Sequence, residues 1–132
     1  MAIVITQWAL NAYLDLKAQR VFSDEDYWNT LRPDVLLLKD YPHAIKFKNG
    51  KFWSVAQEAS GELLPNGYKM KWHQVGHAKV QLRLPVTLLK QAFLCEAYVK
   101  ENEKQEKRKL AVFKTHLQLI QQGRYSECGI LT

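Results

Sequence analysis

The stretch "YKMKWHQVGHAKVQLRL", residues 68–84, alternates between apolar and polar side chains on both sides of Gly76. Successive side chains of a strand point to opposite faces, so each half predicts a β-strand with one apolar and one polar face. We expect two antiparallel strands joined near residues 75–77, with Pro85 either ending the second strand or lying on an unpaired edge. The polar face is basic, because it carries Lys69, Lys71, His73, Lys79, Gln81 and Arg83.

Helices are expected before this hairpin. Residues 6–20 place apolar side chains at helical spacing after Thr6, which can cap a helix. Ser23 followed by three acids is typical of another helix start, because carboxylates stabilise the positive end of the helix dipole. Pro33 then predicts either a break near Arg32 or a further helix that starts at Pro33.

Extended segments and a final helix are expected after residue 42. Turn sequences at 48–51 and 60–67 enclose a candidate strand, and residues 92–100 form an apolar run with the length of a central strand. Residues 101–123 show apolar spacings of three and four and end at a glycine, which predicts a closing helix.

The sequence therefore predicts a single α+β domain spanning residues 1–132. Its expected parts are two to three N-terminal helices within residues 1–42, a twisted antiparallel sheet of three to four strands within residues 43–100, and the C-terminal helix at 101–123.

Composition limits the possible classes of protein. No apolar run approaches the roughly 18 residues needed to cross a membrane, so we expect no membrane partner. The N-terminal segment has no basic leader and no cleavage pattern, which predicts no secretion signal. The two cysteines, Cys95 and Cys128, are too few for a disulfide framework. We therefore expect a protein of the reducing cytoplasm.

The net charge of +6 is concentrated in one third of the chain. Residues 69–109 contain ten Lys or Arg and four acids, whereas the remainder contains nine of each sign. A region of one sign raises the local potential and attracts polyanions, while a surface that serves only solubility usually mixes its charges. The pattern favours a nucleic acid or an acidic protein as partner.

The sequence contains little sign of metal or cofactor chemistry. His73 and His77 are four residues apart, which suits a helix, but the same spacing on a strand separates two side chains by about 13 Å. Glycine-rich phosphate loops, nucleophile elbows and paired-acid patterns are absent. We therefore expect two surface histidines near a turn, no metal site and no cofactor.

A basic face could cleave RNA without a metal. Such a reaction needs a base for the 2′-hydroxyl, cations that stabilise the phosphorane and a proton donor for the leaving 5′-oxygen. Closely spaced lysines can act as the base if like charge lowers their pKa, and Lys or Arg can stabilise the phosphorane. His or Tyr can donate the proton. Tyr68, Trp72 and Tyr98 could stack on bases, although core packing is favoured for each.

Two segments resemble the RelE/ParE superfamily of toxins from type II toxin–antitoxin systems. Residues 67–84, "GYKMKWHQVGHAKVQLRL", are similar to the family's pair of strands, in which a K-x-K stretch leads through a small turn to a basic residue. Residues 93–117, "FLCEAYVKENEKQEKRKLAVFKTHL", resemble the family's apolar strand, the basic loop after it and the helix that follows. The likeness is closest to the HigB-like and phage-derived branch and covers about half of the chain.

The resemblance implies a function. Members of the RelE and HigB branches are cytoplasmic, ribosome-dependent endoribonucleases that cut mRNA in the decoding site, and a cognate antitoxin protein holds them inactive. It therefore predicts a metal-independent mRNA endoribonuclease that inhibits translation, arrests growth and joins higher-order toxin–antitoxin complexes. Two alternatives stay open: a ParE-like inhibitor of DNA gyrase without nuclease activity, and an RNA-binding module without toxicity.

The resemblance also implies roles for individual residues. Lys69 and Lys71 match the strand lysines, and Lys79 matches the basic residue that contacts phosphate. The basic segment before the last helix matches Lys104, Lys107 and Arg108, which with Arg83 would bind RNA. The family's Tyr or His near the final helix has no counterpart at the start of that helix here. His73, His77 and Tyr125 are the candidate proton donors, and the predicted catalytic set is Lys69, Lys71, Lys79, His73 and Tyr125.

Overall fold

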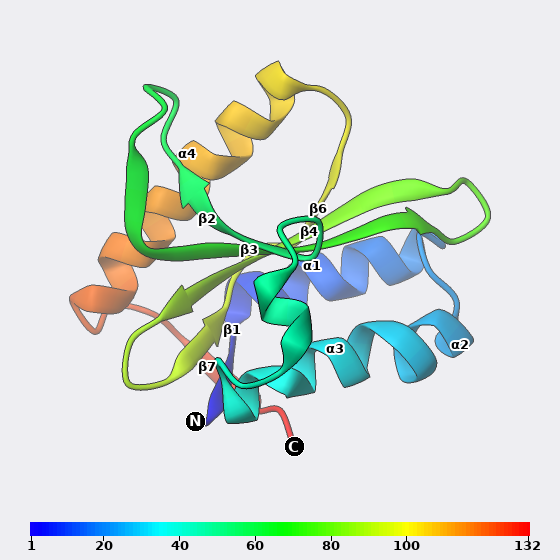
Figure 1. Cartoon of the computed structure of the whole chain (residues 1–132), viewed down its shortest axis with the longest axis horizontal. Helices are drawn as coiled ribbons and strands as arrows, with labels where there is room; N and C mark the ends of the chain where they lie inside the picture. Colours follow the sequence, from blue (N-terminus) through cyan, green and yellow to red (C-terminus); the bar gives the residue numbers. More distant parts are fainter.

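A computed structural model describes residues 1–132, in which a seven-stranded mixed sheet has helices on both faces (Figure 1). The helices are α1 (Gln7–Ala18), α2 (Asp24–Asp26), α3 (Arg32–Leu36) and α4 (Glu103–Gln121). The strands are β1 (Ile3–Thr6), β2 (Trp53–Gln57), β3 (Leu63–Val75), β4 (Val80–Leu88), β5 (Ala92–Leu94), β6 (Tyr98–Lys100) and β7 (Glu127–Ile130). A π turn (Tyr27–Leu31) joins α2 to α3, and 3-10 turns follow at Leu37–Asp40 and Ile45–Lys48.

The strands lie in the order β2-β3-β4-β5-β1-β7. Strand β6 pairs with β4 on the edge that β5 also uses, because β3 occupies the other edge along its length. Strands β1 and β5 run parallel, and the other pairs are antiparallel. The α+β class and the β3–β4 hairpin are confirmed. Residues 92–100 form two short strands where one central strand was expected: β5 lies between β4 and β1, whereas β6 pairs with β4 alone.

The prediction of a purely antiparallel sheet with three to four strands is wrong. Strand β1 lies inside the segment expected to be helical, and its Ile3 and Val4 are fully buried on opposite faces of the sheet. A strand buried on both faces reads as a short continuous apolar run, which lacks the alternation used to recognise strands. Strand β7 is a mostly exposed edge of four residues and has no apolar pattern at all.

The N-terminal helices begin where capping residues predict. The hydroxyl of Thr6 accepts a hydrogen bond from the Ala9 amide at 3.2 Å, and Ser23 forms a reciprocal capping box with Asp26. These bonds satisfy amides that have no partner within the helix. Of the two alternatives for Pro33, the helix is correct, and it begins one residue earlier, at the start of α3.

Both predictions for Pro85 are wrong, because β4 continues to Leu88 and Pro85 is fully buried inside the sheet. The amide and carbonyl of one strand residue point to the same side, and the Pro85 carbonyl accepts a hydrogen bond from the Cys95 amide at 3.0 Å. Residues 95–97 separate β5 from β6 at this point. Proline has no N–H group to donate. At Pro85 such a donor would point into the gap between β5 and β6, so the sheet loses no backbone hydrogen bond there.

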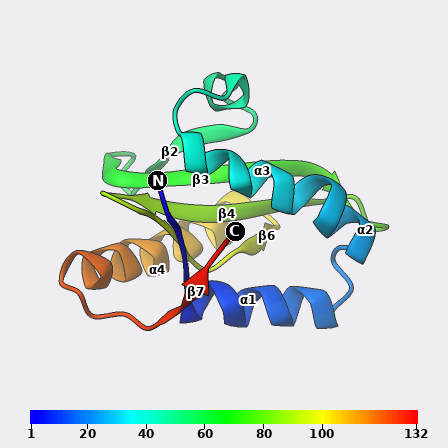
Figure 2. The same ribbon diagram turned by 90° about the horizontal axis from the view of Figure 1, so that it is seen from below.

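Two hydrophobic cores lie on opposite faces of the sheet. The larger one joins α1, α3 and the 3-10 turns to side chains such as Leu82 and Leu84 of β4. The smaller one packs Phe113 and Leu117 of α4 against Val4 and other sheet residues. Figure 1 shows α4 apart from the other helices, and Figure 2 shows that α1 and the α2–α3 segment run in opposite directions. None of the helices is long and apolar enough to span a membrane.

Candidate functional site

Basic side chains from three neighbouring strands share the face of the sheet that α4 covers only in part. Lys71 of β3 lies opposite Arg83 of β4, and Arg83 lies opposite Tyr98 of β6. Lys69 lies opposite Pro85 on one side of this row, and Lys100 lies opposite Gln81 on the other side. The alternation of the strands therefore places all five side chains on one face, opposite the larger core.

Glu106, in the first turns of α4, is the centre of this group. Its carboxylate accepts a hydrogen bond from the Tyr98 hydroxyl at 2.7 Å. The Nζ atoms of Lys69 and Lys100 lie 3.5 and 3.6 Å from Oε1, and Nε of Arg83 lies 3.9 Å from Oε2. Glu106 and Arg83 are 5% and 4% exposed, so these contacts form in a partly desolvated setting. We call Lys69, Lys71, Arg83, Tyr98, Lys100 and Glu106 the basic cluster.

The basic cluster has more positive than negative charge. It contains four cations, Lys69, Lys71, Arg83 and Lys100, and one carboxylate, Glu106. Exposed Glu103, whose carboxylate lies 2.7 Å from Nζ of Lys100, adds a second negative charge beside it. Burial raises the pKa of Glu106, but the Tyr98 hydroxyl and the cations Lys69, Lys100 and Arg83 outweigh it, and the pKa is lowered. Nε of Arg83 is buried without a hydrogen-bond partner. An additional anion would therefore be stabilised here.

The pKa of Lys71 is lower than that of an ordinary lysine. Burial lowers the pKa of its ammonium group from 10.5, and the charges of Lys69 and Arg83 lower it further. Its Nζ donates a hydrogen bond to the Gly50 carbonyl, which fixes the amine at the edge of the cluster. A lysine with a lowered pKa has a larger neutral fraction near pH 7 and can act as a base.

A cleft of about 520 Å³ opens beside the cluster. Its walls are the connection between β2 and β3 and the first turns of α4, and its floor includes Lys69 and Glu106. Lys100 and Lys107 also line it. Three acids, Glu58, Glu103 and Glu106, line it together with these three lysines, and the cleft leads to the basic cluster.

The other predicted site residues divide into near and distant groups. His73 lies on β3 two residues beyond Lys71, and its Nε2 is 2.8 Å from the Lys51 carbonyl, next to the carbonyl that Lys71 contacts. Lys79 is exposed in the β3–β4 turn. Lys104, Lys107 and Arg108 are exposed on the first turns of α4 and are not in a loop before it, as the resemblance had implied.

Tyr125 lies apart from the basic cluster. It follows the C-terminal end of α4, and its ring packs edge-on against Phe93 at 5.3 Å in the smaller core. Glu106 is near the opposite end of this helix of 19 residues, which is about 28 Å long. The structure therefore does not bring Tyr125 together with the predicted lysines.

The aromatic side chains that could have stacked on bases pack inside the protein or on one another. Trp72 and Tyr98 are buried, and the half-exposed Tyr68 stacks on Trp53 at 5.0 Å. The Trp72 indole donates a hydrogen bond to buried Asp34 at 2.9 Å. The expectation of core packing is thus confirmed for Trp72 and Tyr98. His77 is exposed in the turn, and no group of three or more His, Cys, Asp or Glu side chains could hold a metal ion.

Sequence reasoning missed Glu106 and Lys100 as members of the site, and it considered Tyr98 only for base stacking or core packing. One signal was available for Glu106, because it continues the buried stripe of α4 at helical spacing. The stripe consists of Glu106, Leu110, Phe113, Leu117 and Ile120. An acid on an apolar stripe requires a buried partner, and the basic strands supply it.

Comparison with models of protein families, with curated proteins and with solved structures gave no match to this chain. The function of the candidate site is therefore inferred from its residues, geometry and charge.

Proposed function

We propose that the basic cluster binds RNA and cleaves it without a metal ion, as the endoribonuclease toxin of a type II toxin–antitoxin system. The observation that carries this proposal is the gathering of Lys69, Lys71, Arg83 and Lys100 on one face of the sheet beside Glu106, where burial and the neighbouring charges lower the pKa of Lys71. It provides a base next to an excess of positive charge, and metal-independent cleavage needs both. The resemblance of residues 67–84 and 93–117 to RelE/ParE toxins supports the same function.

The cluster suggests a division of roles. Neutral Lys71 takes the proton of the 2′-hydroxyl, whose oxygen attacks the adjacent phosphorus. Lys69, Arg83 and Lys100 stabilise the negative charge that grows on the phosphorane. The 5′-oxygen then leaves, which produces a 2′,3′-cyclic phosphate on one fragment and a 5′-hydroxyl on the other.

His73 is the proton donor that fits this arrangement best. It lies about 7 Å along β3 from Lys71 on the same face, and both side chains contact carbonyls of the segment before β2. Protonated His73 would give its proton to the 5′-oxygen as that oxygen leaves. Tyr125 is not assigned this role because it lies at the far end of α4.

The expected partners follow from charge. A ribosome would present mRNA to the cleft, and the exposed Lys104, Lys107 and Arg108 would contact its phosphates. A cytoplasmic antitoxin with an acidic or amphipathic segment would block RNA most simply by covering the same face. A DNA gyrase inhibitor and a non-toxic RNA-binding module are the alternative functions.

The test is induced expression followed by primer extension on cellular mRNA. Wild type is compared with Lys71→Met, with Lys69→Ala/Lys71→Ala and with the matched control Lys39→Met on the opposite side of the molecule. We expect growth arrest and codon-positioned cuts for wild type and Lys39→Met, and neither for the cluster variants at equal amounts of folded protein. Growth arrest without cuts would indicate a gyrase-directed or other toxin, and unimpaired growth would contradict both toxin functions.

A further inference from the structure

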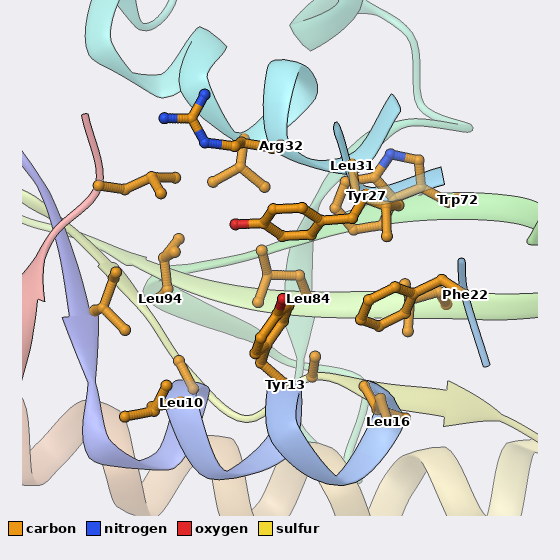
Figure 3. A pocket seen from close by; sticks show the side chains of 16 residues that line it. Leu10, Tyr13, Leu16, Phe22, Tyr27, Leu31, Arg32, Trp72, Leu84 and Leu94 are labelled. Atoms are coloured by element: carbon orange, nitrogen blue, oxygen red, sulfur yellow. The ribbon is translucent and has the colours of Figure 1, made fainter. Parts of the chain in front are cut away.

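A second cavity, of about 240 Å³, lies on the face of the sheet opposite the basic cluster (Figure 3). Helix α1 forms one wall, the π turn with α3 forms the other, and Leu82, Leu84 and Leu94 form the floor. Fifteen of its sixteen lining residues are hydrophobic, and Arg32 is the exception. The cavity thus combines an apolar interior with one charged group.

The residues that line this cavity carry two tyrosine hydroxyls and one guanidinium. Tyr13 extends from α1 and Tyr27 from the π turn toward each other across the pocket, as Figure 3 shows, and their ring centres are 5.3 Å apart. Burial and Tyr13 raise the pKa of the Tyr27 hydroxyl, whereas the positive charge of Arg32 is near enough to lower it to a smaller extent. One cation and the two hydroxyl groups are therefore available to a ligand that enters between the helices.

Arg32 has unused capacity for an anion. None of the ion pairs of the molecule includes it. Its guanidinium donates to the main-chain oxygen of Thr132 and lies 5.1 Å from the centre of the Trp28 ring. A guanidinium has five N–H donors in a planar fork that matches a carboxylate. The arginine therefore favours a carboxylate over a neutral polar group.

The rim is accessible, because Leu10, Tyr13, Tyr27, Arg32 and Leu131 are each only half-buried. The volume limits what can enter. An apolar cavity of about 150 Å³ holds benzene in other proteins, so 240 Å³ suits an aromatic ring with a short chain or a medium-length acyl chain.

We propose that this cavity is a binding site for a small monocarboxylate with a compact apolar body, whose carboxylate pairs with Arg32 and whose body packs against Leu84 and Leu94. The proposal does not depend on the proposed endoribonuclease function, because the cavity and the basic cluster occupy opposite faces of the sheet. Aryl alkanoates and medium-chain fatty acids share this chemistry.

The experiment titrates the full chain with 4-phenylbutyrate, with octanoate and with the uncharged 4-phenylbutan-1-ol, using calorimetry and amide NMR spectra. We expect saturable binding of at least one carboxylate, signal shifts for α1 and the α2–α3 segment, and at least about tenfold weaker binding of the alcohol. A preference for octanoate would assign the site to acyl chains, and a preference for phenylbutyrate would assign it to aryl acids.

Two variants and a control distinguish the contribution of the Arg32 charge to binding from that of the apolar cavity. Arg32→Gln should weaken carboxylate binding about tenfold or more and leave alcohol binding within about twofold. Ala97→Leu places a larger side chain into the cavity and should abolish binding of all three probes. Arg124→Gln is the same substitution at an exposed site outside the cavity and should bind as wild type. Equal binding of acid and alcohol by wild type, or no binding at all, would overturn the proposal.

Discussion

At the scale of single residues, the basic cluster is organised by one buried carboxylate. Glu106 contacts Lys69, Arg83, Lys100 and the Tyr98 hydroxyl, although its side chain is only 6% exposed. Removing one partner of a buried ion pair is costly, because the opposite charges lose their compensation but stay out of water. Glu106 therefore serves both the stability of the fold and the position of the cations.

Glu106→Gln should lower the free energy of unfolding by about 3 kcal/mol or more. Glutamine keeps the size of the side chain but leaves Lys69 and Arg83 without a negative partner, whereas Lys100 keeps Glu103. Urea unfolding at pH 7 measures the effect. Glu103→Gln is the matched control, because Glu103 is exposed and its pair with Lys100 should contribute no more than about 1 kcal/mol. Equal losses in the two variants would contradict the central role of Glu106.

The lowered pKa of Glu106 also predicts how the free energy of unfolding depends on pH. The pKa of Glu106 is lower in the folded state than its ordinary value of 4.5, so folding favours the ionised form. This stabilisation is complete above pH 4.5 and is lost as the pH falls through the lowered pKa of the folded protein. Unfolding curves between pH 7 and 3 should therefore show an acid-dependent loss in wild type that is reduced in Glu106→Gln. Identical pH dependence would show that other groups cause the loss.

Lys71 predicts a different pH dependence, in the rate of RNA cleavage. If neutral Lys71 is the base and a protonated group is the donor, the pH–rate profile is bell-shaped, and one of its limbs reports deprotonation of Lys71 at a pH below the ordinary pKa of 10.5. Lys71→Arg keeps the charge but cannot deprotonate, so it should bind RNA and cleave it about 10²–10⁴-fold more slowly. Single-turnover cleavage from pH 6 to 10 measures both. An unchanged profile in Lys71→Arg would exclude Lys71 as the base.

At the scale of elements, the hairpin shows what an alternating sequence can and cannot specify. The faces of β3 and β4 follow from alternation, so the basic face was predictable. The position of α4 over only part of that face was not, since it depends on how Phe113 and Leu117 pack in the smaller core. Strand β1 was missed because burial on both faces removes alternation, and Pro85 was misjudged because the interruption at 95–97 is visible only in three dimensions.

The tip of the β3–β4 hairpin packs closely against the connection between α1 and α2. Gly76 has a φ of +70°, and a Cβ atom at this position would lie 2.1 Å from the Val21 carbonyl oxygen, in the connection between α1 and α2. Gly76→Ala should therefore destabilise the protein by about 2 kcal/mol or more, from backbone strain and from displacement of that connection. Gly50→Ala, where a Cβ atom meets nothing within 4 Å, should change stability by less than about 1 kcal/mol. Thermal unfolding compares the two, and equal shifts would contradict the close contact.

At the scale of the whole molecule, one sheet separates two surfaces with different chemistry. The face toward α1 and α3 is apolar and contains the cavity with Arg32, whereas the face toward α4 contains the basic cluster and its cleft. The concentration of charge in residues 69–109 could be predicted from the sequence. The convergence of that charge on one carboxylate could not, because Glu106 is 37 residues from Lys69 in the chain.

This placement of charge predicts that RNA binding depends steeply on salt. Each phosphate neutralised by a cation on a single strand contributes about −0.7 to the slope of log K against log salt concentration. Contacts from Lys69, Lys100, Lys104 and Lys107 would thus produce a slope of about −3. Lys104→Gln/Lys107→Gln should reduce its magnitude by about 1.4 with little change in sequence preference. Lys39→Gln, on the opposite side, should leave it unchanged. Fluorescence anisotropy with an unstructured RNA between 50 and 300 mM salt measures these slopes, and affinity indifferent to salt would contradict binding led by phosphates.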